Sequence, residues 1–511
     1  MKKLALLSVS NKAGIVELAR ELVEKFEFEL ISSGGTASTI QSASLPVTKV
    51  SDYTGSPEIL GGRVKTLHPR IHGGILARRD NPTDLADLAD NQISPLDLVV
   101  VNLYPFEQTI ANSDITLAEA IEQIDIGGTA MLRAAAKNFA HLTVLCDPSD
   151  YPLYLEELQR NSGTTSPAFR QQQASKTFAH TGAYDLAITD YFASLSAETK
   201  SFTLSGMPQQ TLRYGENPHQ SATWYQTGAK PMGLAAAQQL QGKALSYNNL
   251  VDLEAARRII AEFAPQEPAA AVLKHTNPCG AAIAPSLSEA YEKAFQADSI
   301  SAFGGIVAFN QAIDSATATA LTKTFLECVI APACDVQAQE ILATKSKLRV
   351  LLLSDLTQGL TEEVRTIAGG FLVQATDNLI EQPQDWKVVS DQQPTPAQIA
   401  ELSFAWKIAK HVKSNAIVVT KERTTLGIGA GQMNRVGAAK IALEQAGEPA
   451  KGGFLASDGF FPFDDSVRTA AAAGISAIIQ PGGSLRDKDS IAAANELGLV
   501  MIMTGTRHFL H

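Results

Sequence analysis

The chain has 511 residues, and at about 150 residues per domain this length predicts about three domains. Hydrophobic residues make up 45% and charged residues 19%, which supplies apolar material for large cores and excludes an intrinsically disordered protein. The formal net charge of −11 argues against a general DNA- or RNA-binding surface, although a local basic pocket for one small phosphate is compatible with it.

Cysteine use and hydropathy narrow the class further. The four cysteines form no CxxC pair, so neither a disulfide framework nor a zinc ribbon is indicated. No apolar run approaches 18 residues, and the first residues lack a signal-peptide cleavage pattern. We therefore expect a soluble, cytoplasmic, multidomain α/β protein with no membrane contact.

The first part of the chain alternates between predicted strands and helices. Buried-strand patterns cover residues 4–10, 28–32, 98–103 and 142–146. Helical spacing covers residues 15–26 and 129–137, and a further helix opens at 33–36. This alternation predicts a parallel sheet with helices on both faces. Residues 194–210, rich in Ser, Thr and Gln, are expected to be the linker that ends this domain.

The remainder is predicted to be internally duplicated. A strand over 271–275, Gly280-Ala281, a helix and a strand over 306–309 correspond to a strand over 416–420, Gly429-Ala430, a helix and a strand over 454–456. The interval from Gly280 to Gly304 is 24 residues and that from Gly429 to Gly452 is 23. Two related α/β subdomains are the simplest interpretation. Chance similarity of two Gly-Ala turns is the alternative.

Two glycine-rich turns in the first part are candidate anion sites. Ser33-Gly34-Gly35-Thr36 and Asp125-Ile126-Gly127-Gly128 are each expected to follow a strand and open a helix, so that backbone N–H groups point at a ligand. Lys12 is expected at the same edge of the sheet. Neither turn matches a dinucleotide fingerprint or a P-loop, which favours a monophosphate. Alternatively, each Gly-Gly pair only makes a tight turn.

Basic and phenolic residues follow in the next loops. Residues 63–69 form a polar, basic loop with Arg63 and Lys65, and Tyr104 follows a buried strand. Tyr, Lys and Asp side chains at one sheet edge could polarise a carbonyl and move protons. In the competing interpretation, Tyr104 packs as a strand-end aromatic residue while Arg63 and Lys65 are solvated.

Lys274 and His275 end an apolar strand and are expected to lead into an Asn277-Pro278 turn at a sheet edge. A histidine there suits proton transfer near neutral pH, although it could instead only cap the turn. A zinc deaminase would need His-x-Glu and Pro-Cys-x-x-Cys, but Asn277 replaces the Glu and Ala282 replaces the second Cys. The sequence therefore predicts no metal.

Two further segments concentrate recognition side chains. The loop 213–220 holds Arg, Asn and His between Gly and Pro, an uncommon set for an inert linker. Residues 460–465 place aromatic faces beside carboxylates, which suits a planar heterocycle. A buried hydrophobic strand end is the usual alternative for such a run of Phe.

Together these segments resemble one family, the bifunctional AICAR transformylase/IMP cyclohydrolases of purine biosynthesis. The resemblance covers the whole chain and depends on eight motifs in order: SGGT at 33–36, RVKTLHP at 63–69, NLYPF at 102–106, IDIGGTAMLRAAAKN at 124–138, RYGENPHQ at 213–220, LKHTNPCG at 273–280, AGQMNR at 430–435 and FFPF at 460–463. It implies a methylglyoxal-synthase-like cyclohydrolase domain over 1–197. Two zinc-free, cytidine-deaminase-like transformylase subdomains would follow over 198–380 and 381–511.

The resemblance also implies the chemistry. The transformylase would transfer a formyl group from 10-formyltetrahydrofolate to AICAR (5-aminoimidazole-4-carboxamide ribonucleotide), with Lys274, His275 and Asn415 as catalytic residues. The cyclohydrolase would close formyl-AICAR to IMP with loss of water and without a metal. Its catalytic residues would be Lys65, Tyr104, Asp125 and Lys137, the last two near the start of the Gly127-Gly128 helix.

Binding residues are implied in the same way. Nucleotide contacts would come from Ser10, Lys12, Ser33, Gly35, Thr36, Arg63, Arg213, Tyr214, Asn249 and Arg507. Folate contacts would come from Phe303, Arg435, Phe460, Pro462, Phe463 and Asp465. The family also implies a homodimer with transformylase sites at its interface. A nucleotide-binding regulatory protein and an enzyme that kept only one of the two activities are the alternatives.

Overall fold

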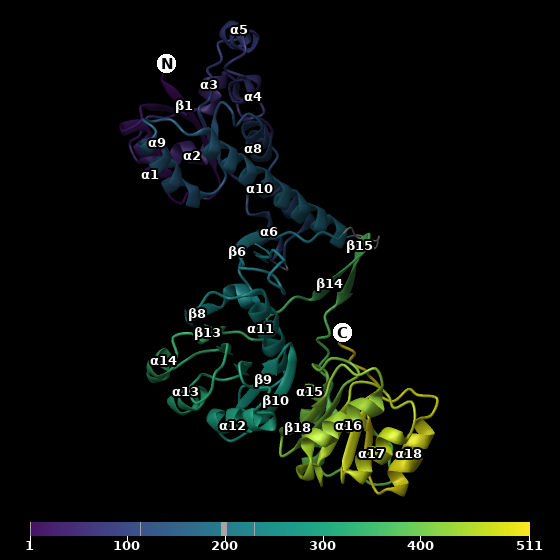
Figure 1. Ribbon diagram of the computed structural model, residues 1–511. Coiled ribbons are helices and arrows are strands. Elements are labelled where there is room, and N and C mark those ends of the chain that lie inside the picture. The colour runs from purple at the N-terminus through teal and green to yellow at the C-terminus, as the bar shows by residue number, and fades with distance from the viewer. Residues whose placement is uncertain (1, 113, 196–201, 229) are drawn as a thin grey trace. The chain divides into compact units, whose positions relative to one another are not determined.

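The computed structural model describes residues 2–112, 114–195, 202–228 and 230–511. These residues form two compact units, Met1–Ser205 and Gly206–His511, which are described separately below (Figure 1). The predicted domain boundary between residues 197 and 198 lies outside the described residues.

The first unit is built on a five-stranded parallel sheet in the order β3-β2-β1-β4-β5. Its strands are β1 (Lys3–Val9), β2 (Phe28–Ser32), β3 (Thr48–Lys49), β4 (Leu98–Asn102) and β5 (Thr143–Leu145). Its helices are α1 (Ile15–Glu24), α2 (Gly34–Ser42), α3 (Val50–Thr54), α4 (Pro69–Leu76), α5 (Pro82–Asp90), α6 (Phe106–Ile110), α7 (Leu117–Glu122), α8 (Gly127–Lys137), α9 (Tyr151–Arg160) and α10 (Pro167–Ser194). The predicted parallel α/β sheet is confirmed.

Both faces of this sheet are covered, because alternate residues of one strand enter different cores. Leu4 and Leu6 of β1 pack with residues of α4 and α8, whereas Ala5 and Leu7 pack with residues of α1 and α9. This is the period-2 alternation of a strand that is buried on both sides. The carboxyl ends of the strands thereby lie along one edge, where such sheets bind ligands.

The expected linker is only partly a linker. Residues 196–201 of the predicted segment 194–210 lie outside the described residues. Its last residues belong to β6 (Met207–Thr211), which pairs with β7 (Thr223–Gln226), so the expectation of a structureless segment up to residue 210 is wrong. Most residues of β6 are exposed, and an exposed strand carries no apolar pattern for sequence reasoning to detect.

The second unit contains a twelve-stranded sheet in the order β16-β21-β20-β19-β17-β18-β10-β9-β11-β12-β13-β8. Its strands are β8 (Gln238–Gln241), β9 (Ala269–Lys274), β10 (Asn277–Ile283), β11 (Ile306–Phe309), β12 (Cys328–Ala331), β13 (Arg349–Leu352), β16 (Lys387–Val388), β17 (Ile417–Lys421), β18 (Thr424–Gly429), β19 (Phe454–Ser457), β20 (Ala477–Gln480) and β21 (Val500–Met503). A separate hairpin is made by β14 (Glu362–Ile367) and β15 (Gly370–Ala375).

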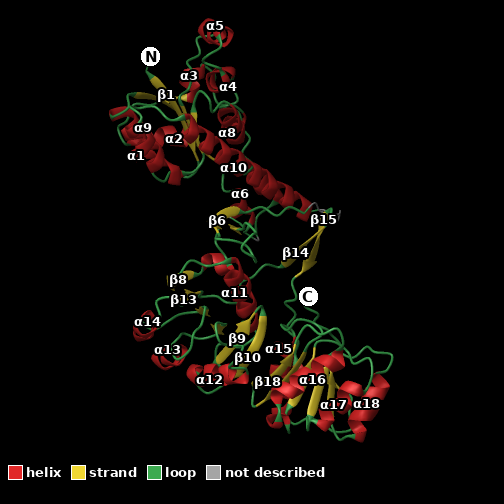
Figure 2. Ribbon diagram, in the orientation of Figure 1, coloured by secondary structure: helices red, strands yellow, loops and turns green. Residues whose placement is uncertain are grey.

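This strand order reads the same from the centre outward in both directions. The first repeat runs β10-β9-β11-β12-β13-β8 and the second β18-β17-β19-β20-β21-β16, so the predicted duplication is confirmed. In Figure 2, red helices flank the yellow strands of each repeat. The helices are α11 (Tyr247–Ile260), α12 (Leu287–Ala297), α13 (Ser315–Leu321) and α14 (Val336–Ala343) in the first repeat, and α15 (Pro396–Ala409), α16 (Arg435–Ala446), α17 (Asp465–Ala472) and α18 (Asp487–Glu496) in the second.

The register of the duplication differs from the predicted one. Gly280 pairs with Val272, and the residue in the equivalent place, opposite Val419, is Gly427 rather than Gly429. A Cβ atom on Gly280 would lie 1.8 Å from the Ala294 carbonyl oxygen of α12, and one on Gly427 would lie 2.0 Å from the Ala442 carbonyl oxygen of α16. Glycine is needed at both positions because a helix packs directly on the strand.

Candidate functional site

In the first unit, the start of α2 is tied to the end of β1. The Ser33 and Ser8 hydroxyl oxygens are 2.6 Å apart. A Cβ atom on Gly35 would meet no atom within 4 Å, so the first turn of α2 is open to a ligand, as an anion site requires. Thr36, however, is buried, and its hydroxyl accepts from Val9 N (3.1 Å) and donates to Val9 O (3.0 Å). This hydroxyl fastens α2 to β1, and the predicted phosphate contact of Thr36 stays a prediction.

Two lysines meet beside this helix start. Burial lowers the pKa of Lys12, and the nearby charge of Lys65 lowers it further. The Lys12 ammonium donates to the carbonyl oxygens of Val9 and, at 3.3 Å, Ser10. Each of the two lysines disfavours the protonated form of the other, and a bound anion would stabilise the protonated form of both. This edge therefore suits a phosphate monoester.

Asn102, the last residue of β4, holds the loop that carries Ser10 and Lys12. Its Oδ1 accepts from Ser10 N (2.5 Å) and Asn11 N (2.9 Å), and its Nδ2 donates to Asn11 O (3.0 Å). Sequence reasoning assigned Asn102 no role. The available signal was a polar side chain at the end of an otherwise apolar strand.

Asp125 lies at the start of α8 with Lys65 and Tyr104 nearby. Burial raises the pKa of Asp125, whereas a hydrogen bond from Gly128 N (2.6 Å), the charge of Lys65 and a backbone hydrogen bond from Tyr104 oppose that rise. Tyr104 is 39% exposed, so its phenol is accessible. The backbone of Tyr104 and the charge of Lys65 thus lie near the Asp125 carboxylate, and the predicted meeting of the three side chains stays a prediction.

Two predicted residues of this unit lie differently from expectation. Lys137 is the last residue of α8, ten residues after Gly127, which corresponds to about 15 Å of helical rise. The expectation that it lies near the start of that helix is wrong. Arg63 is exposed and forms an ion pair with Glu122, the last residue of α7. A bound phosphate would therefore compete with the Glu122 carboxylate for the Arg63 guanidinium.

In the second unit, Lys274 and His275 lie at a two-residue hairpin turn. The strand β9 ends at Lys274, and His275 and Thr276 have φ of 51° and 64°, the conformation of a type I′ turn. Asn277 and Pro278 already belong to β10, so the expected Asn-Pro turn is wrong by two residues. The Lys274 ammonium donates to the Phe303 carbonyl oxygen at 2.8 Å, while His275 is exposed at the tip.

Asp252 of α11 supports this turn. Its Oδ1 accepts from Thr276 N at 2.7 Å. Burial raises the pKa of Asp252, and the positive charges of His275 and Lys274 act against that rise, so all three groups lie close together. Sequence reasoning missed Asp252, which lies in a helix 22 residues before Lys274. The sequence of a helix does not indicate which of its residues contacts a distant turn.

Asn277 brings the hairpin to the loop before β17. Its Oδ1 accepts from Lys413 N at 3.0 Å, which places His275 and Asn415 at the same edge of the central strands. The Asn415 Nδ2 donates to Gln432 O at 2.7 Å, and its Oδ1 accepts from Arg435 Nη2 at 2.7 Å. The first turn and the loop before β17 are thereby joined by a direct hydrogen bond.

Two predicted ligand contacts also form hydrogen bonds inside the protein. Arg435 is only 6% exposed and binds Ser457 and Asp458, and its predicted contact with folate stays a prediction. Asn249 is 8% exposed and forms a capping box with Ser246 at the start of α11. Its side-chain oxygen caps the helix, and its predicted contact with the nucleotide stays a prediction.

The other predicted contacts are accessible. Phe460 and Phe463 are 36% and 50% exposed, Pro462 between them is exposed, and Arg486 lies 4.9 Å from the Phe463 ring. Asp465 opens α17 and accepts from Ser466 N at 2.7 Å. Phe303 is 60% exposed, with its ring 5.4 Å from that of Phe325.

The predicted phosphate arginines are exposed, and each guanidinium lies over a neighbouring aromatic ring. Arg213 is 5.5 Å from the Tyr214 ring and Arg507 is 4.6 Å from the Phe509 ring. His508, which sequence reasoning missed, is buried between Asp377 (2.6 Å) and Glu381 (2.9 Å). Burial alone would lower the pKa of His508, but these two carboxylates raise it to about 9, so a charged His508 anchors the segment that carries Arg507.

Comparison with known proteins identifies the family. The family described as AICARFT/IMPCHase bienzyme matches residues 135–445, and the MGS-like domain matches residues 14–130. The bifunctional purine biosynthesis protein PurH of Microcystis aeruginosa is 71% identical over 511 residues, and that of Synechocystis sp. is 68% identical over 512 residues. Both alignments cover all of this chain and all of the relative. The chain belongs to the AICARFT/IMPCHase bienzyme family.

Membership gives this chain the family's two activities, AICAR transformylase and IMP cyclohydrolase, with 10-formyltetrahydrofolate as the formyl donor. The MGS-like match lies in the first unit, as the resemblance implied. Among solved structures, the crystal structure of ForH is 36% identical over 38% of this chain and all of its own, with a TM-score of 0.35.

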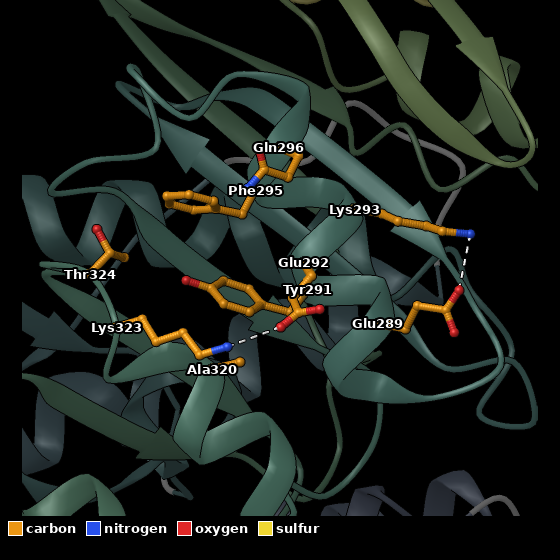
Figure 3. Close-up of a pocket in the computed structure, with 9 residues that line it drawn as sticks. All are labelled: Glu289, Tyr291, Glu292, Lys293, Phe295, Gln296, Ala320, Lys323 and Thr324. Carbon is orange, nitrogen blue, oxygen red and sulfur yellow. Dashed lines mark hydrogen bonds and ion pairs between the residues drawn. The ribbon is translucent and has the colours of Figure 1, made fainter.

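Figure 3 shows a surface hollow in the second unit. That hollow is lined by residues of α12 and of the end of α13, and ion pairs join Lys293 to Glu289 and Lys323 to Glu292 beside it. None of the predicted site residues lines it. Over the described ranges, no group of three or more His, Cys, Asp or Glu side chains could hold a metal ion. No helix in the described part of the chain has the length and apolarity to span a bilayer.

Proposed function

We propose that the site of the second unit transfers the formyl group and that the site of the first unit closes the ring, as two steps of purine biosynthesis. The observation that carries this assignment is the hydrogen bond from Lys413 N to Asn277 Oδ1. It joins the His275 turn of one repeat to the Asn415 loop of the other, at one edge of the central strands.

In the transfer step, the exocyclic amine of AICAR attacks the formyl carbon of 10-formyltetrahydrofolate. This amine is a weak nucleophile because its lone pair is delocalised, so a positioned base is needed. His275 takes the amine proton, and Lys274 and an N–H of Asn415 stabilise negative charge on the formyl oxygen. The carbon–nitrogen bond to folate then breaks, and a proton passes to the departing folate nitrogen.

Substrate contacts around that site follow from exposure. Arg213, Tyr214 and Arg507 are proposed to hold the AICAR phosphate, because both guanidinium groups are exposed beside aromatic rings. The accessible residues proposed for the folate side are Phe303, Phe460, Pro462, Phe463 and Asp465. Aromatic faces suit the planar pteridine and benzoyl rings.

In the cyclisation step, the carboxamide nitrogen of formyl-AICAR attacks the formyl carbon and water leaves. Tyr104 and Lys65 exchange protons with the attacking nitrogen and the leaving oxygen, and Asp125 orients the carboxamide. Ser10, Lys12, Ser33 and Gly35 hold the phosphate at the start of α2. The catalytic role of Lys137 stays a prediction, as does the requirement for no metal.

We further propose that the protein acts as a cytoplasmic homodimer. The β14–β15 hairpin supports the homodimer, because a two-stranded hairpin is only marginally stable alone in water. It exposes apolar side chains on both strands: Val364 is 37%, Ile367 52% and Leu372 56% exposed. A second copy of the chain would cover them.

The assignment of the first unit is tested with Tyr104→Phe in the full-length protein. Removing a half-exposed hydroxyl should leave the fold intact but slow cyclisation of formyl-AICAR by about 10²-fold, while formyl transfer stays near the wild-type rate. Tyr225→Phe, which removes a similarly exposed phenol from β7, should change neither rate. Normal cyclisation by Tyr104→Phe would show that the assignment is wrong.

A further inference from the structure

Asp458 is a fully buried carboxylate that directly follows β19. Its exposed fraction is 0%. Oδ2 accepts from the Ser414 hydroxyl at 2.5 Å, and Oδ1 accepts from Ala416 N at 3.1 Å and from Arg435 Nη1. Asp458 therefore lies directly behind the loop that carries Asn415, without being exposed to a substrate itself.

The first repeat shows which of these contacts needs a negative charge. Asn310 directly follows β11 and occupies the equivalent place, and its Oδ1 accepts from Ala269 N at 2.9 Å. The backbone N–H of Asn310 points to Ala269 O (3.5 Å), as that of Asp458 points to Ala416 O (3.3 Å). A neutral amide thus performs the structural task in one repeat, so the charge of Asp458 serves another purpose.

That purpose is visible in the contacts of Arg435. A guanidinium is a fixed fork of donors with no acceptor. One nitrogen of this fork binds Asp458, and the other donates to Asn415 Oδ1 at 2.7 Å. Since only an oxygen can face that donor, the Asn415 amide cannot rotate by half a turn. Its Nδ2 then donates to Gln432 O at 2.7 Å, and among the described residues this is its only hydrogen bond.

We propose that Asp458 is a positioning residue for formyl transfer: through Arg435 it fixes the Asn415 amide so that the second N–H of Nδ2 points to the reacting substrate. The proposal rests on the proposed role of Asn415 as an amide donor. A buried ion pair is weak evidence for stability by itself, because desolvation offsets much of the attraction. Holding one side-chain geometry is a use that such a pair can serve.

The first test is Asp458→Asn in the full-length enzyme. Asparagine retains an acceptor for Ala416 N, as Asn310 does for Ala269 N, but it loses the charge that holds Arg435. We expect kcat for formyl transfer to fall by roughly tenfold to a hundredfold, the range found for outer partners of metal-binding side chains, with the KM values for AICAR and the formyl donor within about twofold of wild type. Cyclisation by the first unit should be unchanged, and a thermal unfolding midpoint of the second unit close to that of wild type shows that the variant folds.

A matched control is Glu401→Gln. Glu401 is another buried carboxylate of the second repeat, and it accepts a backbone N–H from Arg423 at 2.7 Å, away from Asn415. Its neutral variant should transfer formyl groups at the wild-type rate. Wild-type kcat for Asp458→Asn, or an equal loss in Glu401→Gln, would overturn the proposal.

The coupling to Asn415 is measured in a double-mutant cycle. If Asp458 acts through Asn415, adding Asp458→Asn to Asn415→Ala should change kcat by less than about twofold. Independent, multiplicative losses would overturn the proposal and leave the proposed function standing. Wild-type turnover by Asn415→Ala would instead overturn the role of Asn415 and, with it, this inference.

A second variant covers the case in which Asp458→Asn does not fold. Arg435→Lys keeps a positive charge for Asp458 but cannot reach Asp458 and Asn415 together as a fork. It should lower kcat for formyl transfer by a similar factor and leave cyclisation intact. Full transfer activity in this variant would also overturn the proposal.

Discussion

The two hairpin turns of the duplicated unit have the same construction and different side chains. In the first repeat, Lys274 ends β9 and donates to the Phe303 carbonyl at 2.8 Å; in the second, Lys421 ends β17 and donates to the Lys451 carbonyl at 2.8 Å. Asp252 accepts from Thr276 N, and Glu401 accepts from Arg423 N, both at 2.7 Å. The turn residues have positive φ in both repeats.

What differs is the residue at the tip. His275 of the first turn corresponds to Glu422 of the second. Thr276 corresponds to Arg423, whose guanidinium forms an ion pair with Glu267 at 2.5 Å. The second turn is therefore closed by a salt bridge, whereas the first presents an imidazole. The comparison teaches that the backbone and the lysine contact belong to the duplicated scaffold, and that the proposed chemistry depends on the few side chains that diverged.

Replacing the tip residues tests this difference most strongly. His275→Ala should lower kcat for formyl transfer by roughly 10²–10⁴-fold, the usual worth of a positioned general base, while AICAR affinity changes much less. Glu422→Ala at the equivalent tip should leave transfer unchanged. Steady-state kinetics of both full-length variants provide the measurement, and thermal unfolding of each variant is the folding control for the second unit. Near-wild-type transfer by His275→Ala would reduce this histidine to a turn residue.

The two lysines sharpen the comparison, because their observed contacts are alike. Lys274→Ala should cut transfer by about 10²–10³-fold if its ammonium stabilises charge on the formyl oxygen. Lys421→Ala should not alter transfer. The losses of Lys274→Ala and His275→Ala should combine to less than their product, since the two residues act on one reaction step. Equal effects of the two lysine variants would show that Lys274 serves only the hairpin.

The carboxylates behind the turns should differ less. Asp252→Asn retains an acceptor for Thr276 N but removes the charge beside Lys274 and His275, and we expect transfer to fall on the order of tenfold, as for one charge-assisted hydrogen bond. Glu401→Gln should instead affect stability. Similar activity losses in both variants would argue against a special role for the first turn.

The pH dependence of that stability effect has a definite sign. Burial raises the pKa of Glu401 above its ordinary value of 4.5, so the folded state favours the protonated form. The resulting stabilisation is present below pH 4.5 and is lost as the pH rises through the raised pKa. Glu401→Gln should therefore be at least as stable as wild type at pH 8, and this difference should shrink at pH 4.5. Thermal unfolding at the two pH values measures it; a larger Tm advantage of the variant at pH 4.5 would contradict the sign.

The smallest expected effect is that of a chelator. Neither repeat has the His and Cys spacing of a zinc site, so dialysis against a strong chelator should leave transfer and cyclisation at their initial rates. Metal analysis of the same samples completes the test. Stoichiometric zinc that is lost together with activity would mean that one repeat holds a metal.

The sequence by itself determined that the first unit is a sheet covered by helices, and it determined which residues lie at the carboxyl edge of that sheet. Apolar runs such as 98–101 can only be central strands, and their alternation with helical patterns requires a parallel sheet whose carboxyl ends share one edge. For that reason Lys65, Tyr104 and Asp125 could be expected together from their places after strands or before a helix. Local polarity and period carry this information without any knowledge of contacts.

The tertiary structure alone decided how individual polar groups are used. Thr36, Asn249 and Arg435 have the residue types of ligand contacts, yet each is occupied by a partner inside the protein. Asp252 and Asp458 support the proposed sites from positions that no local pattern marks. Asn102 is marked only as a polar residue that ends an apolar strand, which does not reveal its partners. The physical reason is that a buried hydrogen bond depends on the distance between groups that lie tens of residues apart, and only the packing of helices on the sheets fixes that distance.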